Sequence, residues 1–420
     1  MSKKLKIFVI SDHPFSPSGV GTQTRYMVEG LLQTGDYSFV CFGGAIKHKD
    51  YKPQKFENYG DDLVVYPVDG YGTQESVRSI LRTERPDILW FMTDPRFFPW
   101  LWEIEDEIRT LVPMVYYHVW DNYPYPVYNR VWYESCDSVV AISKVTQDIV
   151  KNVAPNVHSE YLPHAVVPEY FHPLQDDEIS ELRKRSDVDE DEFVVFWNNR
   201  NARRKQSATL IFWFKKFLDR IGNKKAKLIM HTDPKDINGP DLNSVIMHLK
   251  LTNGQVMFST NRLEFKQLAS LYNIADVTVN ISDAEGFGLS TLESLSCGTP
   301  IIVNMTGGLQ EQVTDGEEWF GVGIEPSSKA VIGSQEIPFI YEDRINEDDF
   351  VDALEKLYNM SKEERKEIGM KGLNHVEKKY NFNEYIARWN QILRDIHERN
   401  GSWETRSGYQ RWHLDEVKSD

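Results

Sequence analysis

Short apolar runs alternate with longer amphipathic segments along most of the chain. Runs of about four to eight apolar, β-branched or aromatic residues between turn residues are typical of buried strands. In the first half of the sequence this pattern predicts strands at 6–11, 38–44, 87–92, 114–119 and 138–143. The segment 22–35 has helical spacing, and Gly35 marks its expected end. The alternation indicates a parallel, doubly wound sheet.

The pattern breaks near residues 171–173 and then starts again. Residues 175–192 are highly charged and contain no strand-like run, so we interpret them as a link between domains. A second series of apolar runs predicts strands at 193–199, 226–233, 255–260, 276–282 and 299–304. We therefore expect an α/β protein with two tandem Rossmann-like domains that face a central cleft. The expected parts are an N-terminal domain at 1–174, the link at 175–192, a C-terminal domain at 193–375 and a helical tail at 376–420.

Length, charge and cysteine content narrow the class of protein. The 420 residues fit two domains of about 100–200 residues each. A net charge of -16 argues against extended binding to nucleic acid, and leaves at most peripheral contact with a membrane. Three widely separated cysteines fit neither a disulfide framework nor a zinc site, and they indicate a reducing compartment. The apolar run at 5–10 is too short for a secretory signal, so we expect a cytoplasmic protein.

The most informative stretch is DAEGFGLSTLESLSCGTP at residues 283–300. It places a glycine-rich turn between a predicted strand and a predicted helix, so the backbone N–H groups of Gly288, Leu289 and Ser290 are expected to point outward as a phosphate site. Glu285 precedes the turn and can reach a neutral polar group of a ligand. Glu293 lies further along the helix and can accept hydrogen bonds from the paired hydroxyls of a ribose.

A basic run, WNNRNARRKQ at 197–206, also follows a predicted strand and precedes an apolar helix. Cations at a helix N-terminus are unfavourable unless an anion is present, so the run predicts a phosphate ligand. Its basic residues are Arg200, Arg203, Arg204 and Lys205. A second glycine turn, Gly307-Gly308, follows the strand at 299–304. Gly19 and Gly21 open the first helix, but without a third glycine they fit a dinucleotide fingerprint poorly.

Taken together, these motifs resemble glycosyltransferase family 4, whose members are retaining, nucleotide-sugar-dependent enzymes of the GT-B fold. The resemblance covers nearly the whole chain and rests on E-x7-E at 285–293 with its GTPIIV flank, the upstream Arg200 and Lys205, GGxxE at 307–311 and GVGTQTR at 19–25. It implies a C-terminal helix that packs back on the first domain. It also implies roles for individual residues: Arg200 and Lys205 on the donor diphosphate, Glu285 on the transferred sugar beside the backbone of Gly286, Phe287 and Gly288, Leu289 and Ser290 on the phosphate, Glu293 on the ribose, Gly19 in a loop over donor phosphate and acceptor, and His118 near the reacting carbon.

The resemblance further implies the activity. A sugar would move with retention from a nucleotide-diphosphate sugar, most readily UDP-linked, to a saccharide or glycoconjugate hydroxyl. The nucleotide sugar is a co-substrate, and no cofactor or metal is expected. The leaving phosphate oxygen would take the acceptor proton, so Glu285 would position the sugar rather than attack it. The string Asp187-Val188-Asp189 lies in the charged link, and we interpret it as solvated charge.

Alternatives remain open at this stage. The same fold could serve a non-catalytic nucleotide-sugar-binding scaffold, or an enzyme that isomerises or hydrolyses nucleotide sugars. The acceptor could instead be a nucleotide, a modified base or a lipid. Aromatic residues after the strands of the first domain fit either a saccharide platform or core packing. They are Trp90, Phe97, Phe98, Trp100, Trp102, Trp120, Tyr123 and Tyr125.

Overall fold

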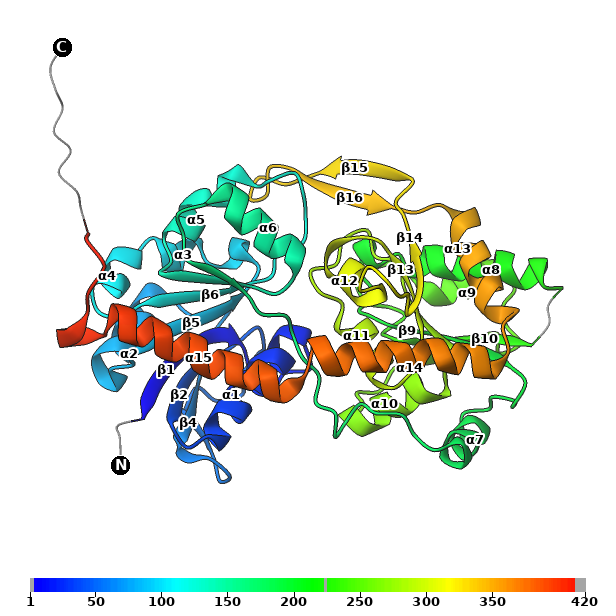
Figure 1. The fold of residues 1–420 in the computed structure, drawn as a ribbon, viewed down its shortest axis with the longest axis horizontal. Coiled ribbons are helices and arrows are strands. Elements are labelled where there is room, and N and C mark those ends of the chain that lie inside the picture. Colours follow the sequence, from blue (N-terminus) through cyan, green and yellow to red (C-terminus); the bar gives the residue numbers. More distant parts are fainter. Residues whose placement is uncertain (1–3, 223–224, 412–420) are drawn as a thin grey trace, which may run out of the picture. The chain divides into compact units, whose positions relative to one another are not determined.

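A computed structural model describes residues 4–222 and 225–411. The chain divides into two compact units (Figure 1). The first holds the chain up to Trp120, the segment Tyr125–Leu162 and the chain from Asn383, and the second holds Asp121–Pro124 and Pro163–Phe382. Among the described residues, no helix is both long enough and apolar enough to cross a membrane.

The first unit is built on an eight-stranded sheet in the order β3-β4-β2-β1-β5-β6-β7-β8, parallel except for β3. Its strands are β1 (Leu5–Asp12), β2 (Tyr37–Gly44), β3 (Gln54–Phe56), β4 (Gly60–Pro67), β5 (Ile88–Thr93), β6 (Met114–His118), β7 (Ser138–Ala141) and β8 (Ser159–Tyr161). Its helices are α1 (Gly19–Gln33), α2 (Gln74–Glu84), α3 (Pro99–Trp102), α4 (Glu105–Arg109), α5 (Arg130–Glu134), α6 (Lys144–Val153) and α15 (Phe382–Asn400).

The last long helix, α15, packs on this first sheet, as the resemblance implied. The Trp389 ring is fully buried and lies 5.8 Å from the ring of Trp90 and 4.9 Å from that of Tyr117. The Tyr37 hydroxyl donates a hydrogen bond of 2.8 Å to Oδ1 of Asn390. A buried tryptophan on an amphipathic helix thus ties the end of the chain to strands far away in sequence.

The second unit has a six-stranded parallel sheet in the order β11-β10-β9-β12-β13-β14 and a separate hairpin, β15–β16. Its strands are β9 (Phe193–Asn198), β10 (Ala226–His231), β11 (Val256–Ser259), β12 (Val277–Asn280), β13 (Ile301–Asn304), β14 (Gly321–Ile324), β15 (Ser328–Ile332) and β16 (Ile340–Arg344). Its helices are α7 (Asp176–Arg185), α8 (Ser207–Arg220), α9 (Leu242–Leu249), α10 (Phe265–Ile274), α11 (Leu289–Ser296), α12 (Gln310–Val313), α13 (Glu347–Tyr358) and α14 (Lys362–Lys379).

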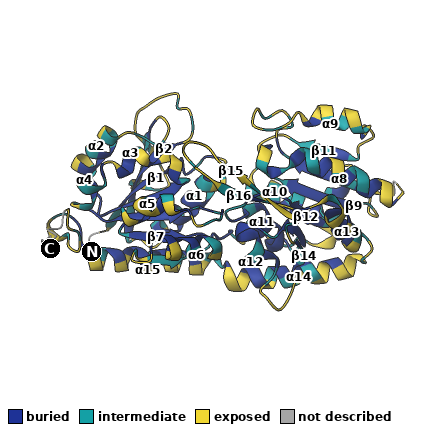
Figure 2. Cartoon of the chain, turned by 90° about the horizontal axis from the view of Figure 1, so that it is seen from above, coloured by how far each residue is buried: buried dark blue, intermediate teal, exposed yellow. Residues whose placement is uncertain are grey.

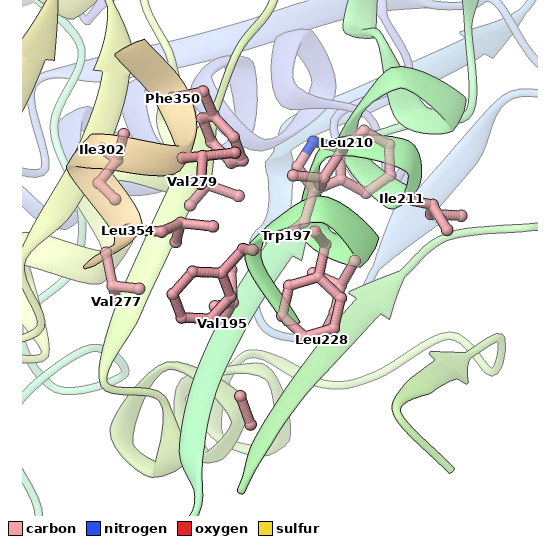
Figure 3. Close-up of a cluster of buried hydrophobic side chains, with 14 of the residues drawn as sticks. Val195, Trp197, Leu210, Ile211, Leu228, Val277, Val279, Ile302, Phe350 and Leu354 are labelled. Atoms are coloured by element: carbon pink, nitrogen blue, oxygen red, sulfur yellow. The ribbon is translucent and has the colours of Figure 1, made fainter. Parts of the chain in front are cut away.

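The strands at the centre of each sheet are almost wholly buried, whereas the helices alternate between buried and exposed faces (Figure 2). In the second unit, Trp197 from β9, Val279 from β12 and Phe350 from α13 are among the side chains of one apolar cluster (Figure 3). Parallel strands that are covered on both faces read as continuous apolar runs, which is why the sequence pattern found them.

The segment 175–192, interpreted as a link, lies within the second unit. It carries helix α7, whose Arg183 is buried and donates a hydrogen bond of 2.8 Å to the carbonyl of Ile274. Asp187 and Asp189, the acids of the DxD string, have exposed carboxylates near Lys227 and Lys225, which fits solvated charge.

Most of the aromatic residues of the first unit belong to its core. Trp90, Phe98 and Trp102 are buried, and the Phe98 and Trp102 rings pack around Phe91 at 5.1 and 5.8 Å. Phe97 keeps an exposed face. Core packing therefore accounts for these three buried rings, whereas Phe97 and Tyr125 are exposed and Trp100 is half-buried, so the platform interpretation stays open for them.

Candidate active site

The topology of the second sheet brings three loops together. Strand β12 lies between β9 and β13, and all three run parallel. The segments that leave their carboxyl ends are the basic run, the E-x7-E stretch and the second glycine turn. Side chains at the ends of neighbouring parallel strands meet at one edge of the sheet, which is where ligands bind in open α/β sheets.

A buried ion pair joins the first two of these loops. Lys205 lies in the short 3-10 helix η3 (Arg203–Lys205) and is 8% exposed; its Nζ donates to Oε2 of Glu285. Asn280 at the end of β12 lies 3.3 Å from the same oxygen through its Nδ2. Arg204 donates to the carbonyl of Ala284 and so ties the two loops a second time.

The ionisation of this pair follows from its surroundings. Burial lowers the pKa of Lys205 to about 8, and the charge of Arg204 acts in the same direction. Burial would raise the pKa of Glu285, but the cations of Lys205 and Arg204 hold it below its ordinary value. At neutral pH the pair is therefore an ammonium facing a carboxylate.

The second glycine turn packs against the backbone of the first. Gly307 has a φ of +51°, and a Cβ there would lie 1.9 Å from the carbonyl oxygen of Glu285. The Gly308 N–H donates a hydrogen bond of 3.1 Å to that same carbonyl. Gly288, with a φ of +91°, turns the chain into α11. These positions leave no room for a side chain, so the two glycine turns form one interlocked floor.

Helix α11 begins at this floor with its backbone amides uncapped. Gly288 is its N-cap and supplies no side chain, and the first turn carries no acid. The amides of Leu289 and Ser290 therefore belong to a positive helix end that can receive an anion. Phe287 plays a packing role in this structure, since its ring lies 4.9 Å from that of His164 and its carbonyl accepts a bond of 2.7 Å from Gln312. Gly286 lies between Phe287 and the ion-paired Glu285.

Glu293 lies about one turn after the start of α11 and is nearly buried. The Tyr272 hydroxyl donates a hydrogen bond of 2.6 Å to its Oε2, and Asn198 at the end of β9 donates one of 2.8 Å to that hydroxyl. Burial raises the pKa of Glu293 to about 7, although the Tyr272 bond favours the charged form. A ligand that brings hydroxyl donors would stabilise the carboxylate further.

Arg200 was expected beside Lys205, but the structure engages it with Asp236. Its side chain is 66% exposed and donates to the Asp236 carboxylate at 2.6 and 3.3 Å. The Arg200 guanidinium in turn holds the pKa of Asp236 well below its ordinary value. A phosphate bound by Arg200 would have to displace this carboxylate.

Arg204 was left out of the expected site although the same basic run contains it. Its bond to the Ala284 carbonyl and its effect on the ionisation of Lys205 and Glu285 make it part of the site. Its position next to Lys205 was the signal in the sequence.

The two remaining expected residues belong to the first unit. Gly19 is the first residue of α1, and Ser18 caps this helix by accepting a bond of 2.9 Å from the Gly21 N–H. Gly21 is the more constrained glycine, because a Cβ there would lie 2.1 Å from Oγ of Ser16. The role of Gly19 in a loop over the donor phosphate stays a prediction.

His118 ends β6 and is fully buried. Its Nε2 lies 2.8 Å from the Tyr133 hydroxyl, and within the described part of the chain its Nδ1 has no hydrogen-bond partner. Burial lowers the pKa of His118 to about 3, so the ring is neutral. The contact of His118 with a donor sugar stays a prediction, because in this structure its ring is enclosed by Tyr116 and Tyr133.

Comparison with known proteins agrees with this geometry. Residues 178–375 match the family of glycosyl transferases group 1. This part of the chain is a group 1 glycosyl transferase domain. The match contains the basic run, both acids of E-x7-E and the second glycine turn, so the family resemblance found in the sequence is confirmed.

Curated relatives match this chain over shorter stretches. The D-inositol 3-phosphate glycosyltransferase of Paenarthrobacter aurescens is 34% identical over 112 residues, which is 26% of this chain and 22% of that protein. The α-monoglucosyldiacylglycerol synthase of Streptococcus pneumoniae is 23% identical over 188 residues, 44% of this chain and 41% of that protein. The matched stretches thus cover less than half of either relative.

Solved structures match the chain over nearly its whole length. Sucrose-phosphate synthase from Thermosynechococcus elongatus has a TM-score of 0.74 at 17% identity, covering 94% of this chain and 100% of that one. Anabaena HepE, solved with UDP-glucose, has a TM-score of 0.69 at 16% identity, covering 93% and 100%. At such identities the likeness shows the fold, and it confirms the expected GT-B class of two Rossmann-like units.

Proposed function

We propose that this protein is a retaining glycosyltransferase that moves a sugar from a UDP-sugar to a hydroxyl of a saccharide or glycoconjugate. The observation that carries the proposal is the buried Lys205–Glu285 ion pair beside the uncapped N-terminus of α11. A cation and a helix end suit an anionic diphosphate, and a carboxylate suits the hydroxyls of a sugar. UDP is the nucleotide of choice because structural neighbours were solved with UDP-glucose and with UDP-2-fluoro glucose.

The mechanism follows from where charge develops. As the bond to the anomeric carbon breaks, negative charge builds on the departing diphosphate. Lys205, Arg200 and the first amides of α11 would stabilise that charge, and with these positive groups on the diphosphate the proposed reaction uses no metal ion. The departing phosphate oxygen would take the proton of the acceptor hydroxyl on the same face. Glu285 would hold the sugar through its hydroxyls and position the reacting carbon.

The nucleoside end would lie against the chain Asn198–Tyr272–Glu293. An ionised Glu293 can accept hydrogen bonds from both ribose hydroxyls while Tyr272 holds its second oxygen. The acceptor is proposed only as a class, because the relatives are named for compounds as different as inositol 3-phosphate and a glucosyldiacylglycerol. Three free and buried cysteines favour a reducing compartment, so we place the activity in the cytoplasm.

Calorimetric titration with UDP, GDP and ADP, each with and without EDTA, tests the donor site. We expect UDP to bind best and EDTA to leave its affinity unchanged. Lys205→Met should weaken UDP binding by about tenfold or more, because a buried charge-assisted contact is lost. Lys225→Met is the matched control, since Lys225 is an exposed lysine of the same unit that pairs with Asp189 and Asp191. Equal affinity of both variants for UDP would refute the assignment of the diphosphate site.

Measuring the products formed from UDP-sugars distinguishes sugar transfer from the scaffold and hydrolase alternatives. Incubation of UDP-sugars without acceptor should release little free sugar, whereas an accepted saccharide should give a product with the anomeric configuration of the donor. Tight UDP binding without turnover on any acceptor panel would favour the non-catalytic scaffold. Rapid acceptor-independent release would favour a hydrolase.

A further inference from the structure

Two nearly buried carboxylates and two arginines form a cluster beside the site, which we call the charged clamp: Arg203, Asp283, Glu342 and Arg344. Glu342 is 1% exposed and lies between the arginines; Nη1 of Arg203 donates to its Oε2 at 3.0 Å and Nη2 of Arg344 to the same oxygen at 3.3 Å. Nε of Arg344 also lies 3.9 Å from Oδ2 of Asp283. The arginines hold the pKa of Glu342 below its ordinary value against the effect of burial.

The members of the clamp come from three elements, and two of them adjoin the ion pair. Arg203 lies two residues before Lys205, and Asp283 lies two residues before Glu285. Glu342 and Arg344 belong to β16, which pairs with β15 in a hairpin outside the main sheet (Figure 1). A backbone hydrogen bond also joins β16 to the loop of Glu285, since the Asp343 N–H donates to the Asp283 carbonyl at 2.8 Å.

Strand β16 also reaches the third loop of the site. The Thr306 hydroxyl, just before Gly307, donates to Oδ2 of Asp343 at 2.8 Å. Nδ2 of Asn304, at the end of β13, donates to the Asp343 carbonyl at 2.8 Å. A two-stranded hairpin is marginal by itself, so these contacts hold β16 in place and, equally, β16 holds the loops.

A buried carboxylate between arginines is a weak source of stability, because desolvation offsets much of the attraction. What such a network does provide is a fixed arrangement of the groups it joins. We propose that Glu342 is a positioning residue: through Arg203, Asp283 and Arg344 it holds the loop of Lys205 against the loop of Glu285 and so aligns the ion pair for the donor. This inference rests on the proposed donor site and adds a residue that does not itself touch the ligand.

Glu342→Gln keeps the size of the side chain and removes the anion on which both arginines converge. The first readout is the modification rate of Lys205 by limiting acetic anhydride, followed by peptide mass spectrometry without any nucleotide. We expect modification to become several times faster, because Lys205 loses its fixed place against Glu285. The second readout is UDP affinity well below the unfolding temperature, which should weaken by about tenfold, in the range that small misplacement of binding groups produces.

Asp352→Asn is the control, because it breaks an exposed ion pair with Arg220 in the same unit and should change neither readout. If Glu342→Gln does not fold, Arg344→Gln replaces it, since that variant removes one partner of Glu342 and leaves Arg203 in place. If the Glu342 variant folds and its Lys205 is acetylated at the same rate as in the control, the positioning role is refuted, whatever the effect on UDP affinity. Faster modification in a protein that never binds UDP would keep the role of Glu342 and refute the donor site instead.

Discussion

Replacing Gly307 with alanine tests the interlocked glycine turns. Gly307 has a φ of +51°, and a Cβ at this position would lie 1.9 Å from the Glu285 carbonyl oxygen, whereas real Cβ atoms essentially never approach closer than 3.0 Å. The obstacle is backbone, so the loop of Glu285 must move by about 1 Å, the difference between these two distances. That movement also breaks the bond from the Gly308 N–H to the same carbonyl.

The expected cost is the sum of three effects. A left-handed conformation costs a non-glycine residue roughly 1–2 kcal/mol. Overpacking against a rigid neighbour costs roughly 1–3 kcal/mol, and the lost hydrogen bond about 1 kcal/mol. Gly307→Ala should therefore lower the free energy of unfolding by about 3–6 kcal/mol.

Gly254→Ala is the control that separates the cost of the steric contact from the cost of the left-handed backbone conformation. Gly254 lies in the same unit with a φ of +80°, and nothing lies within 4 Å of its Cβ position, so only the first effect applies. Urea unfolding of the full chain, followed by circular dichroism, measures both variants in the same transition. UDP affinity should fall in Gly307→Ala alone, because moving the loop of Glu285 also disturbs its ion-pair partner Lys205 and the start of α11, which we propose to bind the diphosphate. Equal destabilisation by the two variants, with UDP affinity unchanged in both, would refute the claim that the turns are interlocked.

Three further changes give expectations of different kinds. Asp236→Asn releases Arg200 from an exposed ion pair and should tighten UDP binding by about twofold to fivefold in calorimetry, the range of such pairs; weaker binding would mean that Asp236 positions Arg200. Glu285→Gln should leave UDP binding within a fewfold of wild type but abolish sugar transfer in a product assay, since the proposed partner of this carboxylate is the sugar rather than the nucleotide. Glu293 has a pKa raised by burial to about 7, so UDP affinity should improve more from pH 6 to pH 7 in wild type than in Glu293→Gln. Because the raised pKa means that the folded state binds a proton more tightly than the unfolded state, protonated Glu293 stabilises the fold fully below about pH 4.5, and this stabilisation is lost as the pH rises through 7. Relative to Glu293→Gln, the free energy of unfolding of wild type in urea should therefore fall by roughly 3 kcal/mol over this range. A difference between the two proteins that does not change with pH would contradict the assignment.

Most of the strands that sequence reasoning found are buried on both faces, although β11 is only partly buried. β9 is apolar from Phe193 to Trp197, and all four residues of β12 are buried, so neither strand shows the polar alternation of a strand with one face in water. β16 was missed because its sequence, IYEDR, is mostly charged, and no local pattern predicts that the buried Glu342 pairs with Arg203 and Arg344. β14 was missed because glycine fills half of it. Strands of mixed or exposed character have a weak periodic pattern of apolar residues, so they are identified only from the structure.

The residues of the candidate site also fall into those that the sequence predicted and those that it did not. E-x7-E and the glycine turns were visible because a strand, a turn and a helix start impose local requirements on the residues between them. The partners of the basic run were not visible, since Asp236 is 36 residues from Arg200 and Glu342 is 139 residues from Arg203. Adjacent cations in sequence were expected to act together, but the buried Asn201, which bonds to Ser207 and to the Pro240 carbonyl, turns the chain between Arg200 and the rest.

Three of the four cations of the basic run are paired with carboxylates, and this bears on how a donor would bind. Arg200 is held by Asp236, Arg203 by Glu342 and Lys205 by Glu285. A diphosphate must exchange with these carboxylates, so its net affinity is a difference between two sets of charge-assisted bonds. The N-terminus of α11 differs, because no side chain caps its amides. We infer that the phosphate first engages this helix end and then draws Lys205 toward it, which would free Glu285 to accept bonds from the sugar at the moment the donor is in place.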